Sequence, residues 1–87
     1  MIDRLTEELR RRIAEQDRAI LAAVNTRLRL VAELKAHKAR SGAEFVDPEQ
    51  EDRLLRALVD ENDGPLSPAG VRALFEAILA LAKHELP

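Results

Sequence analysis

Apolar residues in the first half of the chain recur at steps of three and four positions, the period of a helix with one packed face. This stripe consists of Leu5, Leu9, Ile13, Ile20, Val24, Val31 and Leu34. No proline or glycine interrupts the 35 residues from Thr6 to Arg40, and most of them are strong helix formers. The pattern therefore predicts one long helix from about Asp3 to Arg40.

Two shorter helical stretches follow, and each begins with a start signal. Asp47-Pro48 places a capping carboxylate before a proline at the first helical position, with Gln50 at the capping-box position. Ser67-Pro68 repeats the arrangement. We predict helices over about residues 48–62 and 68–85. Their inward positions are expected to be Glu51, Leu54, Leu55, Leu58 and Val59 in the first, and Val71, Leu74, Phe75, Ile78, Leu79, Leu81 and Ala82 in the second.

The predicted fold is all-α, with one long N-terminal helix and two shorter helices in a single domain over residues 1–87. Thirty-five residues of helix span roughly 50 Å at about 1.5 Å per residue. A compact domain of this length is only roughly 30 Å across. Because no breaker marks a kink, we expect a second copy of the chain to cover the protruding part in a homodimer.

Composition narrows the function classes. The chain has no cysteine, two aromatic residues and a formal net charge of −2. The lack of cysteine excludes disulfides and thiolate metal sites and fits a cytoplasmic location. Interspersed charges and few aromatics argue against nucleic-acid binding, and no apolar stretch is long enough for a transmembrane span. We expect no metal site, because His37 and His84 lack a metal-ligand spacing.

Two cations interrupt the apolar stripe of the long helix. Arg27 and Lys38 are almost in line on one face and roughly 16 Å apart along the axis. A charge on a packed face needs a counter-charge, and Glu51 on the second helix is the best candidate. One carboxylate against two cations leaves a positive excess, which indicates a pocket for a small anion. The alternative is that both cations lie at the core edge with their charged ends in water.

The order and spacing of four segments resemble those of the all-helical (AroQ-type) chorismate mutases. These segments are Leu9 to Ile13, Asn25 to Leu28, Lys35 to Lys38 and Val46 to Glu51, and a weaker match runs from Val71 to Ile78. The resemblance implies an intertwined homodimeric helical bundle that rearranges chorismate to prephenate in aromatic amino acid biosynthesis. It also implies that no cofactor is needed.

The resemblance assigns roles to individual residues of this sequence. It implies that Arg10 binds a substrate carboxylate in the site of the partner chain, and that Arg27 is the second carboxylate-binding arginine. Lys38 resembles the lysine that contacts the ether oxygen and a carboxylate. Asp47 and Glu51 match the positions that meet the ring hydroxyl, Glu51 through its side chain. Catalysis would then consist of positioning and fixed positive charge.

Three positions depart from the family pattern. Gln50, a candidate substrate-binding residue, stands where the family usually has an arginine, with Arg53 nearby; Ala82 replaces a serine or threonine, and Leu86 replaces a glutamine. These departures leave alternatives open. One is a related lyase or mutase that acts on isochorismate or aminodeoxychorismate. Another is a non-catalytic dimerisation or regulatory module, and a third is a weak mutase completed by a partner enzyme of the same pathway.

Overall fold

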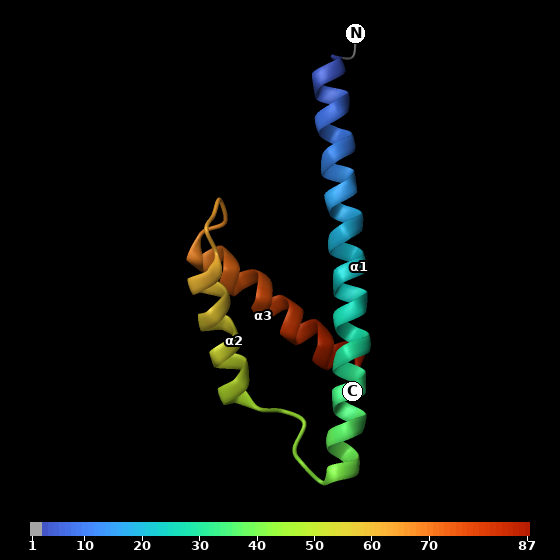
Figure 1. Cartoon of the computed structure of the whole chain (residues 1–87), viewed down its shortest axis with the longest axis vertical. Coiled ribbons are helices and arrows are strands. Elements are labelled where there is room, and N and C mark those ends of the chain that lie inside the picture. Colours follow the sequence, from blue (N-terminus) through green and yellow to red (C-terminus); the bar gives the residue numbers. More distant parts are fainter. Residues whose placement is uncertain (1–2) are drawn as a thin grey trace.

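The structure, a computed structural model, describes residues 3–87 and contains three helices in that range (Figure 1). They are α1 (Arg4–Ser41), α2 (Pro48–Glu61) and α3 (Pro68–Glu85). The all-α prediction is confirmed, and each predicted helix end lies within about one residue of the observed end, the usual uncertainty of such boundaries. Residues 1 and 2 of the expected domain lie outside the described residues.

The helix ends follow the local signals in the sequence. Gly42 ends α1 with a φ of 77°, in the left-handed region that glycine adopts easily. The Asp47 carboxylate accepts a hydrogen bond from the backbone N–H of Gln50 at 3.1 Å, and the Ser67 hydroxyl caps α3 in the same way. The Gln50 side chain does not act as the second member of a capping box, because its oxygen accepts hydrogen bonds from Arg53 instead.

The three helices form an elongated rather than a compact body. Figure 1 shows α3 slanting from the far end of α2 to the C-terminal half of α1, while the N-terminal half of α1 extends beyond both. The chain measures 61 × 24 × 18 Å and has a radius of gyration of 17.0 Å, against roughly 12 Å for a compact domain of this length. None of the helices over residues 3–87 is long and apolar enough to cross a membrane.

The chain buries very little of its own apolar surface. Among residues 3–87 only Val71 and Ala82, both on α3, are buried, and neither is completely inaccessible to solvent. The apolar stripe of α1 is largely uncovered, with Leu5 62%, Ile13 60% and Ile20 59% exposed. Burial of one such side chain contributes about 1.5–3 kcal/mol, and a whole domain is stable by only about 5–15 kcal/mol. An uncovered stripe of this size is typical of a subunit interface.

Two of the inward positions predicted for α3 are wrong within the single chain. Leu74 is 46% exposed and Leu81 is 40% exposed. The packed face of α3 instead follows Val71, Phe75, Ile78, Leu79 and Ala82, which are buried or half-buried. Leu74 and Leu81 lie seven residues apart on the border of this face, and the apolar pattern alone could not separate the border from the centre. The five inward positions predicted for α2 are half-buried, as expected.

Candidate active site

A pocket of about 220 Å³ opens where the C-terminal half of α1, the loop before α2, the start of α2 and the end of α3 meet. One wall is apolar and consists of Val31, Leu34, Phe45, Val46, Leu54, Leu79 and Ala82. The polar lining consists of Arg27, Lys38, Asp47, Gln50, Glu51 and Lys83. An apolar wall with a few convergent polar groups is the usual form of a small-molecule site.

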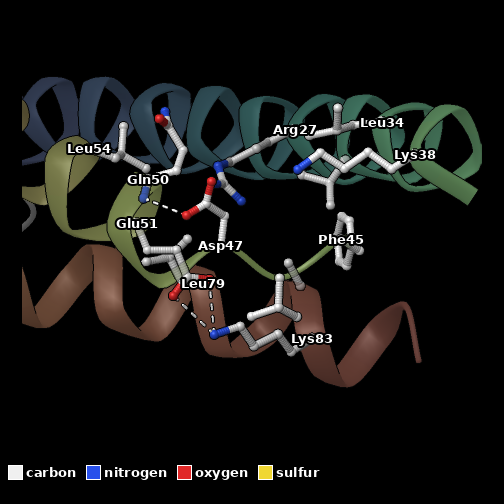
Figure 2. A pocket seen from close by; sticks show the side chains of 13 residues that line it. Arg27, Leu34, Lys38, Phe45, Asp47, Gln50, Glu51, Leu54, Leu79 and Lys83 are labelled. Atoms are coloured by element: carbon white, nitrogen blue, oxygen red, sulfur yellow. Dashed lines mark hydrogen bonds and ion pairs between the residues drawn. The ribbon is translucent and has the colours of Figure 1, made fainter. Parts of the chain in front are cut away.

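Five of the six site residues predicted from the sequence line this one pocket. Figure 2 shows Arg27 and Lys38 reaching from α1 over the hollow in which Asp47, Gln50 and Glu51 lie. The loop after α1 reverses the chain direction, and the Asp47 cap fixes where α2 begins. As a result, the first turn of α2 faces the two cations of α1.

Arg10 is the predicted site residue that the single chain does not bring to the pocket. It lies on the exposed N-terminal half of α1, 17 residues before Arg27. That spacing corresponds to roughly 26 Å along a straight helix, which is beyond the reach of an arginine side chain. Arg10 can therefore act on this pocket only if a second chain presents it.

The two cations that α1 contributes to the pocket, Arg27 and Lys38, are both half-buried. Within residues 3–87, no carboxylate oxygen lies within 4.0 Å of the charged nitrogens of Arg27 or Lys38. Glu51, the expected counter-charge, is engaged elsewhere: its Oε1 lies 3.0 Å from Nζ of Lys83 on α3. The expectation that Glu51 compensates the α1 cations is therefore wrong for this chain. Because Lys83 neutralises Glu51, the charges of Arg27 and Lys38 remain uncompensated by it, and the positive excess that indicates an anion site is kept.

Gln50 lies on the pocket, but Arg53 does not replace the arginine that the family has at position 50. The Arg53 side chain is 61% exposed and lies outside the pocket lining. It donates a hydrogen bond of 2.9 Å to Oε1 of Gln50 and comes within 4.0 Å of Glu49. Arg53 thus holds the Gln50 amide in place and contributes no charge to the lining.

The two C-terminal departures behave differently. Ala82 is buried and lines the pocket, so a hydroxyl-bearing residue there would face the ligand. Leu86 lies outside the lining, and its backbone carbonyl accepts a hydrogen bond of 2.9 Å from Nζ of Lys35.

Sequence reasoning missed Lys83. The sequence could have placed Lys83 on the inward face of α3, because Lys83 follows the inward Leu79 by four residues. Without the crossing of α2 and α3, however, nothing in the sequence pairs it with Glu51.

Replacing Asp47 with alanine should lower the free energy of unfolding by about 1 kcal/mol, because the backbone N–H of Gln50 loses its acceptor. Asp47→Asn should cost much less, since asparagine caps a helix about as well as aspartate. Urea unfolding followed by circular dichroism measures both. Equal losses in the two variants would show that the charge of Asp47, and not its cap, stabilises the start of α2.

The comparisons with known proteins agree with this geometry. A family profile described as chorismate mutase type II matches residues 9–85. A solved structure of chorismate mutase (form I) from Thermus thermophilus is similar to the chain, with 31% identity and a TM-score of 0.86 over 88% of this chain and 96% of that one. Form II of the Thermus enzyme gives 30% identity and a TM-score of 0.87 over 91% and 90%. No curated protein matches the chain significantly.

The three-helix fold and its cationic pocket, together with these neighbours, define the class of protein as an all-helical isomerase of the AroQ type. The chain belongs to the chorismate mutase type II family, whose profile covers most of its length. Family and fold thus assign it the function of a chorismate mutase in aromatic amino acid biosynthesis, in a family that is typically dimeric.

Proposed function

We propose that this chain rearranges chorismate to prephenate in the pocket between α1, α2 and α3, and that it does so as a homodimer. The observation that carries the proposal is the pair of half-buried cations, Arg27 and Lys38, which face an apolar wall and have no carboxylate partner within residues 3–87. Chorismate carries two carboxylates on a compact carbocycle, so it matches a pocket that combines excess positive charge with apolar surface.

The reaction needs no proton transfer and no covalent intermediate. The ether C–O bond breaks as a new C–C bond forms, and negative charge develops on the ether oxygen. A fixed cation beside that oxygen stabilises the transition state more than the bound substrate, which is what accelerates a reaction. We assign this role to Lys38. Arg27 holds one substrate carboxylate through its planar, permanently charged guanidinium. The Glu51 carboxylate accepts a hydrogen bond from the ring hydroxyl.

Asp47 and Gln50 line the pocket at the start of α2. The Asp47 carboxylate already caps α2, so we infer that it shapes the region around the ring hydroxyl without contacting the reacting atoms. Gln50 replaces a family arginine with a neutral amide, and its oxygen is held by Arg53. We assign Gln50 to substrate binding by hydrogen bonding alone.

The second copy supplies Arg10. When two copies of one helix pair antiparallel about a two-fold axis, residues that face each other have residue numbers that always add up to the same value. Half of that value is the residue at the axis. Pairing Arg10 with the midpoint of Arg27 and Lys38 places the axis near Leu21, which is 63% exposed in the single chain. The uncovered apolar stripe on both sides of Leu21 supports such a pairing, because a partner helix would bury it. Each α1 would then serve two pockets.

The direct test follows the loss of chorismate absorbance with purified protein. We expect turnover without added metal or cofactor, and a raised melting temperature with a bicyclic dicarboxylate that mimics the transition state. Turnover of isochorismate in place of chorismate would show that the chain is a related lyase or mutase that acts on isochorismate. Absence of turnover on both, together with no thermal shift at millimolar diacid, would contradict an enzymatic function and favour a dimerisation module.

A further inference from the structure

Lys83 is the third cation of the pocket, and none of the roles proposed above uses it. It lies near the end of α3, directly after the buried Ala82. Its Nζ lies 3.0 Å from Oε1 and 3.2 Å from Oε2 of Glu51, so one ammonium group contacts both oxygens (Figure 2). Lys83 thus engages the carboxylate that is proposed to meet the ring hydroxyl.

This ion pair differs from the others in the described part of the chain. The remaining pairs join residues three or four positions apart within one helix, and their side chains are 49–88% exposed. Glu51 and Lys83 are 32 residues apart and join α2 to α3, and the Glu51 side chain is only 29% exposed. An exposed ion pair within one helix restrains its two side chains only weakly. A pair between two helices fixes the direction of both side chains.

We propose that Lys83 is a positioning residue that holds the Glu51 carboxylate toward the pocket in the orientation that accepts the substrate hydroxyl. The inference rests on the proposed function of the pocket. Glutamate has three rotatable side-chain bonds, and Glu51 lies in the first turn of α2, where water is within reach. Lys83 on the α3 side restrains this freedom before the substrate arrives, which is preorganisation.

The geometry leaves room for the ligand. A carboxylate offers about four acceptor sites, and Lys83 occupies one on each oxygen. The remaining sites can accept the ring hydroxyl. Lys83 also balances the Glu51 charge, which would otherwise repel a dianion. The ammonium therefore acts through Glu51, and it leaves Arg27 and Lys38 to bind the carboxylates.

Kinetics of single and double variants test this role. Lys83→Met keeps the apolar stem and removes the charge, and it should lower kcat/KM for chorismate roughly 10-fold, within the range of coupled neighbours. Lys83→Arg should retain activity within about threefold, because a guanidinium keeps the positive charge and can contact both oxygens of the Glu51 carboxylate. In a Glu51→Gln background, Lys83→Met should change kcat/KM by less than about twofold. An undiminished effect in that background would mean that Lys83 binds the substrate itself, and it would overturn the proposal.

Arg56→Met is the matched control. It removes a cation that pairs with Asp52 at 2.9 Å on the same helix as Glu51, but outside the pocket. We expect kcat/KM to stay within about twofold of the wild type, as for an exposed ion pair. A loss as large as that of Lys83→Met would attribute both effects to general weakening of α2, and the positioning role would then be wrong.

A second measurement does not depend on catalysis. Crystal structures of the wild type and Lys83→Met should show the Glu51 carboxylate facing the pocket in the first and turned to solvent in the second. A carboxylate that keeps its place without Lys83 would overturn the inference. If the wild type fails to convert chorismate, the proposed function fails, and the Glu51 orientation in the two crystals still decides the positioning role by itself.

Discussion

Replacing Lys38 with alanine should lower kcat for chorismate by about 10²- to 10³-fold, the usual effect of losing one group that stabilises a developing oxyanion. Lys38 is half-buried and has no carboxylate partner within residues 3–87, so its charge is available to the ether oxygen. Arg27→Ala should instead act mainly through KM, because a carboxylate is present in the substrate as well as in the transition state. Steady-state kinetics on purified variants measure the split.

Two neighbouring arginines provide controls on the same helix. Arg29 and Arg40 lie two residues after Arg27 and Lys38, respectively, and both are exposed and outside the pocket lining. Arg29→Ala and Arg40→Ala should keep kcat and KM within about twofold, as surface substitutions usually do. If the four variants have equal kinetics, neither Arg27 nor Lys38 contributes to the reaction, and the assignment of this pocket is wrong.

Two variants that are each impaired at chorismate concentrations well below KM should together restore about a quarter of the wild-type activity at those concentrations, if each pocket combines residues of both chains as proposed. Arg10→Ala keeps its own Arg27 and Lys38, whereas Arg27→Ala keeps its own Arg10. A heterodimer of the two therefore contains one complete pocket and one that lacks both arginines. Random pairing of equal amounts makes half of the dimers heterodimers, which gives the expected quarter. Co-expression or joint refolding followed by the chorismate assay measures it.

The matched control is a mixture of Arg27→Ala with Lys38→Ala. Both residues belong to the same half of the pocket, so every pocket in that mixture is defective and no activity should return. Recovery in the control mixture, or none in the Arg10 mixture, would contradict the shared pocket. A monomer in sedimentation at assay concentration would exclude it outright.

The local signals in the sequence were sufficient to predict the helices, and the apolar pattern placed Arg27, Lys38 and Glu51 on facing sides of a pocket; Asp47 and Gln50 were added to it by the family resemblance. Asp47-Pro48 and Ser67-Pro68 start α2 and α3, and Gly42 ends α1, because caps and turns depend on neighbouring residues only. Because the connector between α1 and α2 is short, α2 begins close to the end of α1, and the half-buried Arg27 and Glu51 line the same pocket.

The contacts between helices could not be predicted in the same way. The pairing of Glu51 with Lys83 depends on how α3 crosses α2, and no local rule specifies that crossing. The same reason explains the error on Leu74 and Leu81, because the border of a packed face is set by the neighbouring helix. Arg53 illustrates a third limit: its charge is close to Gln50 in sequence, yet its guanidinium pairs along the helix surface and stays out of the pocket.

The uninterrupted 38-residue α1 leaves little tolerance for inserted or deleted residues. One extra residue between Arg10 and the proposed two-fold axis would shift Arg10 by about 1.5 Å and rotate it by about 100° around the helix. Because the two-fold axis applies the same shift to both chains, both pockets would lose Arg10 at once. An insertion in the turn between α2 and α3 would not rotate residues along a continuous helix in this way. Insertions and deletions in functional relatives are therefore expected in that turn, and α1 should keep its residue count.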